Sequence, residues 1–359
     1  MRISGFGVYR YSLPFTEPLT LKNATLGSRN GLLLRLTGDD GSEGWGEAAP
    51  LSGFSSETLD EAADQLLRAA GEMLAMGGGI PQGDGPAILR PPIAPSVRFA
   101  AELATLNMNA ARRGVSVLDL LDPDARDTLP VNGLLAGPAD EVTAEARRMQ
   151  VAGYHAVKLK AGSLPVEDDA ELVREVGGLL GYGISLRLDA NRAWSFDEAM
   201  EFVRAVRDVR IEYIEEPLAD TSLLPRFADE SGMPVALDES LVGMEPEDLT
   251  AHDYARAVVL KPTLIGGISR TLRLAEEAQC LGMKSVVSSA YESGIGTLGL
   301  ISLAAVTGGA PAGLDTYRRL AEDALTPPLE LRSPVIKVRQ LLEIQRIVDV
   351  ERLQLIARL

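Results

Sequence analysis

The stretch Val157-Lys158-Leu159-Lys160 decides the fold, because it is one of a series of apolar runs that each end in a polar side chain. The terminal residues of these runs recur at intervals of 23 to 29 residues. Such intervals fit one strand, one loop and one helix. Two more short strands fit at 130–135 and 311–314, so eight parallel strands would close a barrel. The terminal residues are Lys160, Asp189, Glu215, Asp238, Lys261 and Ser288.

The length and net charge of the chain limit its domain organisation and the classes of partner that it can bind. A barrel takes roughly 250 residues, so a chain of 359 residues leaves room for a smaller second domain. The 35 Lys and Arg against 51 Asp and Glu give a net charge of −16. An acidic surface repels phosphates, which excludes nucleic acid and anionic membranes as expected partners. The single cysteine, Cys280, excludes an intramolecular disulfide, and we expect it to be a small buried apolar residue.

The N-terminal hundred residues predict a different architecture from the rest. Residues 3–48 predict strands joined by an Asp-Gly turn, and helical patterns follow. Residues 77–95 are rich in Gly and Pro and predict a linker. Residues 294–314 are uncharged but contain six glycines and one proline, which favours a buried helix followed by a strand over a membrane span. The first residues lack the apolar core of a signal peptide, so we expect a cytoplasmic protein.

Three of the strand ends carry carboxylates. Residues two apart in a strand face the same way, so Asp189, Glu215 and Asp238 are expected to converge at one rim of the barrel. Three carboxylates repel one another unless a cation joins them. Oxygen ligands with open positions for substrate favour magnesium, with manganese as the second choice, whereas zinc would recruit His or Cys.

Lysines make up the rest of the predicted site. Lys158 and Lys160 point into the barrel, and Lys261 lies across it with the metal between. Like charges disfavour an ammonium, so Lys158 and the metal would tune Lys160 into a base. The fitting substrate is a carbon acid next to a carboxylate, because proton removal there builds an anion that a metal and a nearby cation stabilise.

This ordered set of residues resembles the enolase superfamily, muconate-lactonizing subgroup. Further stretches are similar to those of the o-succinylbenzoate synthases in particular. The stretches that carry the resemblance are Lys158-x-Lys160, Asp189-Ala190-Asn191, Glu215-Glu216-Pro217, Asp238-Glu239-Ser240, Lys261-Pro262, Pro95-Ser96-Val97-Arg98-Phe99 and Gly313-Leu314-Asp315-Thr316.

The resemblance implies an α/β fold: a modified TIM barrel of the (β/α)7β kind at 106–319, with an α+β capping domain at 1–105 that about 320–359 complete. It implies dehydration of 2-succinyl-6-hydroxy-2,4-cyclohexadiene-1-carboxylate to o-succinylbenzoate, in menaquinone biosynthesis. By similarity Asp189, Glu215 and Asp238 bind magnesium, Lys160 removes the α-proton, Lys261 steadies the ene-diolate and Lys158 tunes Lys160.

The resemblance also implies a small-molecule carboxylate as the partner, with the oligomeric state left open. The substrate pocket would be lined by Asn191, Ser288, Ser289 and Gly313, and a loop at 19–28 would close over it.

Other activities stay open. N-acylamino acid racemases and dipeptide epimerases of the same subgroup keep the same lysines and ligands. Asp315-Thr316-Tyr317 lacks the Asp-x-Asp typical of the epimerases, which disfavours that activity. A Schiff-base aldolase would also use a barrel lysine. An inactive barrel scaffold is the non-enzyme alternative, but such a scaffold is expected to lose at least one ligand or lysine.

Overall fold

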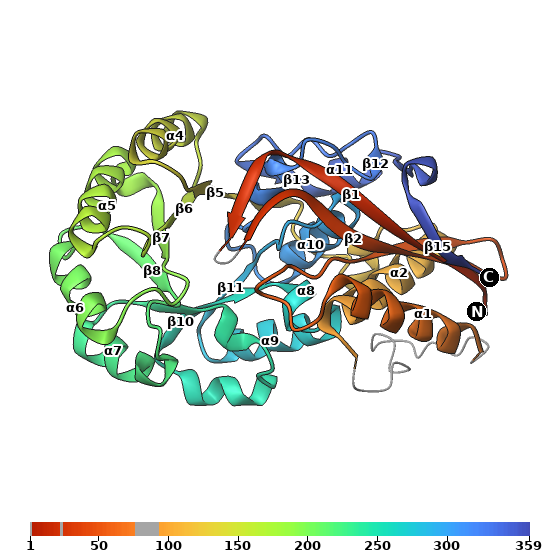
Figure 1. The fold of residues 1–359 in the computed structure, drawn as a ribbon, viewed down its shortest axis with the longest axis horizontal. Helices are drawn as coiled ribbons and strands as arrows, with labels where there is room; N and C mark the ends of the chain where they lie inside the picture. The colour runs from red at the N-terminus through yellow and green to blue at the C-terminus, as the bar shows by residue number, and fades with distance from the viewer. Residues whose placement is uncertain (1, 22–23, 76–92) are drawn as a thin grey trace.

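A curved sheet of seven parallel strands forms one half of the molecule (Figure 1). The computed structural model describes residues 2–21, 24–75 and 93–359. The strands pair in chain order, as the repeated strand and helix pattern predicts. They are β5 (Asn132–Leu135), β6 (Ala156–Lys160), β7 (Ser185–Asp189), β8 (Ile211–Glu215), β9 (Val235–Leu237), β10 (Ala255–Leu260) and β11 (Lys284–Val287).

Residues 311–314 connect the two edges of this sheet. Gly313 forms a parallel bridge with Ser288 next to β11, and Ala312 forms one with Val131 next to β5. The amide of Asn132 donates to Ala312 O at 2.8 Å, and the amide of Gly313 donates to Val287 O at 2.9 Å. The barrel is therefore closed by an eighth, irregular strand, and the predicted fold class is confirmed.

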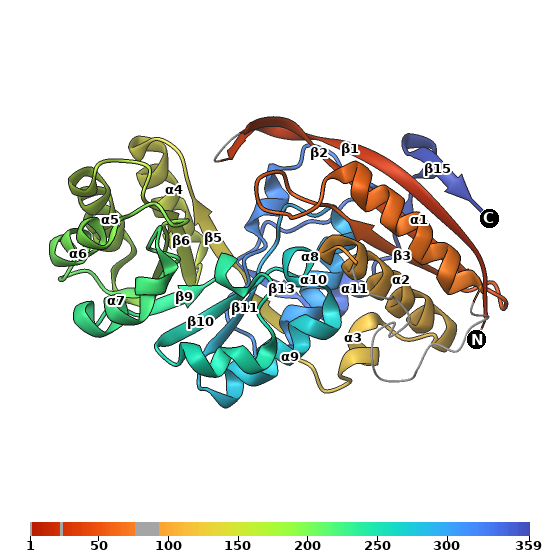
Figure 2. The same ribbon diagram turned by 60° about the horizontal axis from the view of Figure 1, so that its bottom comes forward.

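Helices cover the outside of the barrel (Figure 2). Val157 and Leu159 of β6 are at most 1% exposed and pack in the core between strands and helices, as their alternation with the lysines predicts. The uncharged run at 294–314 begins with a buried helix, as expected. The helices that follow the strands are α4 (Ala139–Ala152), α5 (Val166–Leu180), α6 (Phe196–Ala205), α7 (Leu224–Ser231), α8 (Pro262–Ile265), α9 (Ile268–Cys280) and α10 (Gly294–Val306).

A four-stranded antiparallel sheet forms the cap, in the order β15-β1-β2-β3. Its strands are β1 (Ile3–Leu21), β2 (Ala24–Gly38), β3 (Glu43–Ala48) and β15 (Gln354–Arg358), and α1 (Leu59–Ala75) and α2 (Pro95–Arg113) pack on it. At Gly46 a Cβ atom would lie 1.9 Å from Ala100 O, so glycine is what lets β3 approach α2 this closely. The predicted turn between β2 and β3 contains Gly41 with φ of 81°.

The C-terminal segment returns from the barrel to the cap. Strand β15 pairs with β1 through Gly7 and Arg358, which places the ends of the chain side by side (Figure 1). The expected boundary at 105/106 falls within α2 and stays a prediction. Apart from short 3-10 helices, the remaining elements of the described residues are α3 (Val117–Leu121), β4 (Thr128–Pro130), β12 (Leu325–Thr326), β13 (Val335–Lys337), α11 (Val338–Glu343) and β14 (Ile347–Val348).

Two expectations need correction. Cys280 is exposed at the end of α9, not buried, because the helix presents this position on its outer face. The stretch 19–28 is not an open loop: Leu19 pairs with Leu26 and Thr20 with Thr25, so β1 and β2 continue into a hairpin. Most of the linker predicted at 77–95 lies outside the described residues. Among the helices that the structure describes, none has the length and apolar character needed to cross a membrane.

Candidate active site

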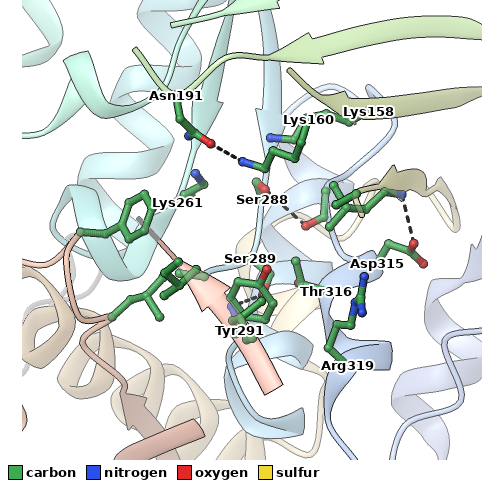
Figure 3. A pocket seen from close by; sticks show the side chains of 18 of the residues that line it. Lys158, Lys160, Asn191, Lys261, Ser288, Ser289, Tyr291, Asp315, Thr316 and Arg319 are labelled. Carbon is green, nitrogen blue, oxygen red and sulfur yellow. Dashed lines mark hydrogen bonds between the residues drawn. The ribbon is translucent and has the colours of Figure 1, made fainter. Parts of the chain in front are cut away.

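A cavity of about 560 Å³ lies between the β1–β2 hairpin and the ends of the barrel strands (Figure 3). Its wall contains all four residues predicted to bind substrate, namely Asn191, Ser288, Ser289 and Gly313, together with the three predicted lysines. Leu19 and Leu21 of the hairpin also line it, as does Phe54. The cap therefore supplies apolar walls, while the barrel supplies the polar ones.

The lysines and the predicted metal ligands form ion pairs in which the carboxylates are buried. Lys158 Nζ lies 2.8 Å from Asp189 Oδ2 and 3.0 Å from Glu215 Oε1. Lys160 Nζ lies 2.7 Å from the same Asp189 oxygen, and Lys261 pairs with Asp238. These contacts follow from strand register, because Lys160 is directly opposite Asp189, and Asp189 is directly opposite Glu215.

The carboxylates lie beneath the lysines. Asp189 and Glu215 have no exposure and Asp238 is 3% exposed, and none of the three lines the cavity. Lys160 has the most accessible side chain of the lysines, 38% exposed against 12% for Lys158 and Lys261. Lys160 is therefore the lysine that a substrate in the cavity can reach most directly.

Burial and charge set the protonation of these groups. Burial alone would lower the pKa of Lys158, but Asp189 and then Glu215 hold it well above its ordinary value. Burial would raise the pKa of Asp189, whereas Lys158 and Lys160 hold it well below the ordinary range. Burial and the neighbouring Asp189 raise the pKa of Glu215. A further cation would relieve the charge that Glu215 cannot easily carry.

The donor set suits a hard divalent cation in chemistry, because it consists of carboxylate oxygens at one rim. In the present arrangement the ammonium groups occupy the contacts of these oxygens, and within the described ranges no three His, Cys, Asp or Glu side chains form a ready metal cage. A bound ion would replace some lysine contacts. Asp189, Glu215 and Asp238 as ligands stay a prediction.

Backbone conformation around the site is strained. Asn191, Arg192, Glu216 and Tyr291 all have positive φ, from 41° to 66°, which non-glycine residues seldom adopt. The Glu216 carboxylate compensates by accepting hydrogen bonds from the amide of Asp238 at 3.0 Å and from Arg192 Nε at 2.9 Å. Glu216 thus positions Asp238 and does not face the cavity itself.

Hydrogen bonds within the barrel and from the cap hold the segment that contains Ser288 and Ser289. Ser289 Oγ donates to the buried Glu292 carboxylate at 2.6 Å, and its amide donates to Gly313 O at 2.9 Å. The buried Arg29 of β2 donates to the carbonyl of Tyr291 at 3.0 Å and to that of Ala290 at 3.2 Å. The cap therefore holds this wall of the cavity in place.

Comparisons with known proteins identify the family. The family described as "Enolase C-terminal domain-like" matches residues 141–341, and "MenC, N-terminal domain" matches residues 3–108. The chain belongs to the enolase superfamily. Among its superfamily relatives, the o-succinylbenzoate synthase of Pasteurella multocida is 33% identical over 90% of this chain and 93% of its own length. The chloroplastic protein PHYLLO of Arabidopsis thaliana is also 33% identical over 93% of this chain, which spans 22% of that longer protein.

Solved structures of the superfamily share the fold. A muconate lactonizing enzyme from Pseudomonas fluorescens complexed with muconolactone has a TM-score of 0.79 and 26% identity, and the match covers 98% of each chain. A dipeptide epimerase from Enterococcus faecalis complexed with Mg and L-Leu-L-Tyr has a TM-score of 0.83 and 21% identity, with 99% and 100% covered. The barrel and cap of this superfamily member therefore have the same fold as these enzymes.

Several cavity residues were missed from the sequence. Arg319 and Tyr291 line the cavity, and Arg29 holds its wall from behind. These three residues do not end a predicted strand, so neither their spacing nor their neighbours indicated a role. Glu47, which accepts the Tyr11 hydroxyl at 2.5 Å and the Ser293 amide at 2.8 Å, was visible only as part of a predicted strand.

Proposed function

We propose that this protein is a magnesium-dependent o-succinylbenzoate synthase of menaquinone biosynthesis, a carbon–oxygen lyase. The proposed reaction converts 2-succinyl-6-hydroxy-2,4-cyclohexadiene-1-carboxylate to o-succinylbenzoate and water. The observation that carries the proposal is that Lys158, Lys160 and Lys261 line one cavity and pair with three carboxylates buried beneath it. The o-succinylbenzoate synthase relatives at about one-third identity support this choice of substrate.

In the proposed reaction Lys160, as the free amine, removes the proton next to the ring carboxylate. The new double bond expels the hydroxyl group from the neighbouring carbon, and Lys160 returns the proton to it, so that water leaves. Lys261 comes from the far side of the barrel and stabilises the negative charge on the carboxylate. Asp189, Glu215 and Asp238 would hold the Mg²⁺ ion, whose chemistry is to stabilise the same developing charge.

An absorbance assay of the cyclohexadiene substrate with Mg²⁺ tests this proposal. Rapid conversion to o-succinylbenzoate that Lys160→Ala abolishes is the expected result. No conversion by the intact protein, under conditions where a known o-succinylbenzoate synthase is active, would contradict it.

Racemization of N-acylamino acids is the second candidate. Lys160 ends β6, whereas Lys261 follows β10, so the two ammonium groups reach the cavity from strands that three others separate. A base on one side and an acid on the other suit removal and return of a proton on opposite faces of a carbon. Exchange of the α-proton of an N-succinyl amino acid in D₂O, followed by NMR, distinguishes this activity from dehydration.

A further inference from the structure

We propose that Arg319 determines substrate specificity by binding a second carboxylate of the substrate, remote from the lysines. This inference rests on the proposed function, because the substrate named there carries one carboxylate on its ring and another at the end of its succinyl group. The ring carboxylate belongs near Lys160 and Lys261, where the proton is removed. The succinyl carboxylate then needs a cation elsewhere in the cavity.

Charge pairing singles out Arg319 among the cations on the wall. Lys158, Lys160, Arg192 and Lys261 pair with carboxylates that are at most 3% exposed. Arg319 pairs instead with Glu17, whose side chain is 78% exposed, at 3.8 Å from Nη1 to Oε2. An exposed pair at this distance contributes little free energy. The Arg319 guanidinium therefore keeps most of its capacity to bind a ligand.

The position of Arg319 is fixed by the cap. It ends the short 3-10 helix Asp315–Arg319, directly after the irregular eighth strand. Its carbonyl accepts from Thr16 Oγ1 at 3.3 Å, and the amide of Ala321 donates to Pro14 O at 2.8 Å. Strand β1 thus holds this backbone where it crosses the mouth of the cavity, while the side chain stays on the cavity wall.

The placement of the side chain matches a substrate with two anionic ends. Figure 3 shows Arg319 apart from Lys160 and Lys261, with Ser289 and Thr316 on the wall between them. The nearby Asp315 attracts Arg319, but its contacts are to other groups: Arg318 Nε lies 2.8 Å from it and the amide of Leu134 donates to it at 3.1 Å. A guanidinium offers paired donors that fit both oxygens of a carboxylate.

The test compares two ligands that differ only in the remote carboxylate, o-succinylbenzoate and 2-butanoylbenzoate, by calorimetry in the presence of Mg²⁺. A charge-assisted hydrogen bond corresponds to about 10-fold to 100-fold in affinity. We expect the intact protein to prefer o-succinylbenzoate by this factor and Arg319→Gln to lose the preference. Arg319→Lys should keep part of it. In the dehydration assay Arg319→Gln should raise KM by a similar factor with kcat nearly unchanged.

Arg226→Gln is the matched control, because it removes an arginine with an exposed ion pair on α7 and changes the net charge equally. Unchanged preference in Arg319→Gln, or binding of neither ligand by the intact protein, would overturn the inference. Loss of the proposed function is recognised separately, as an intact protein that does not dehydrate the substrate. Calorimetry then still decides the role of Arg319, because it needs no turnover.

Discussion

Lys158 and Asp189 form an ion pair of 2.8 Å inside the barrel, in which Asp189 has no contact with solvent. The same ammonium lies 3.0 Å from Glu215, so one lysine contacts two predicted metal ligands. A divalent cation that binds these carboxylates must compete with Lys158. We therefore predict that Lys158 links the stability of the barrel to metal binding.

Replacing Lys158 should expose this link. We expect Lys158→Ala to destabilise the metal-free protein by about 3–5 kcal/mol, because it leaves buried carboxylates without their partner. Added Mg²⁺ should raise the Tm of the variant by more than it raises the Tm of the intact protein. Lys284→Ala is the control, since Lys284 is 59% exposed and pairs with Glu212 at the opposite end of the barrel. Equal Tm losses in the two variants would contradict a special role for Lys158.

Lys160 should matter for rate more than for stability. Its side chain is the most accessible of the three, so Lys160→Ala should leave Tm within a few degrees of the intact protein. Turnover should fall by at least about 10²-fold to 10⁴-fold, the usual contribution of a general base. Steady-state kinetics with a circular dichroism melt on the same samples measures both quantities. A near-normal rate would remove Lys160 from the role of base.

Metal dependence should disappear together with activity. Asp238→Ala removes a predicted ligand that the Glu216 carboxylate holds through its backbone amide. We expect this variant to be inactive at any Mg²⁺ concentration, and the intact protein to lose activity in excess chelator and regain it with Mg²⁺. Full activity of the intact protein in chelator would exclude the metal site.

The contact between β3 and α2 of the cap should leave no room for one added methyl group. Gly46→Ala places Cβ against Ala100 O, and the backbone shift that relieves the contact should cost about 1–3 kcal/mol or more. Gly71→Ala in α1 is the matched control, because its Cβ would meet nothing within 4 Å and alanine favours the helix. Urea unfolding should show opposite shifts of the midpoint for the two variants.

One ion pair of the C-terminal segment should make the free energy of unfolding depend on pH in the acidic range. The Ser116 hydroxyl, then the Arg339 guanidinium, lower the pKa of Asp119 below its ordinary value of 3.8. The folded state therefore favours the ionised carboxylate, so its contribution is present above pH 3.8 and is lost as the pH falls through the lowered pKa. We expect Asp119→Asn to have a lower free energy of unfolding than the intact protein at pH 5. This difference, measured by urea unfolding, should become smaller as the pH falls to about 2. A constant difference would contradict this origin.

The barrel could be predicted because its strands combine two periodicities. Alternation within Val157-Lys158-Leu159-Lys160 gives the faces, and the regular spacing of the strand ends gives the number of units. The same alternation predicts that Lys158 and Lys160 face into the barrel, and the register places Lys160 directly opposite Asp189. The pairing of each lysine with a particular carboxylate was not predicted, because it depends on side-chain reach and burial.

The cavity walls were harder to predict, since they are contacts between segments far apart in the chain. Arg29 meets Tyr291 and Ala290 only because the cap docks on the barrel, and nothing local to β2 indicates that contact. The hairpin at 19–28 was expected as a loop only because the family resemblance implies a closing loop there. Cross-strand pairing with its partner strand keeps it extended instead.

The pairing of β15 with β1 determines when the cap sheet can be completed during translation. Strand β1 precedes the barrel along the chain and is translated before it, whereas β15 is translated after the whole barrel. Until then one edge of β1 presents unpaired amide and carbonyl groups, which invite pairing with other nascent chains. The cap sheet can therefore be completed only after the barrel has been translated, when β15 pairs with this edge of β1.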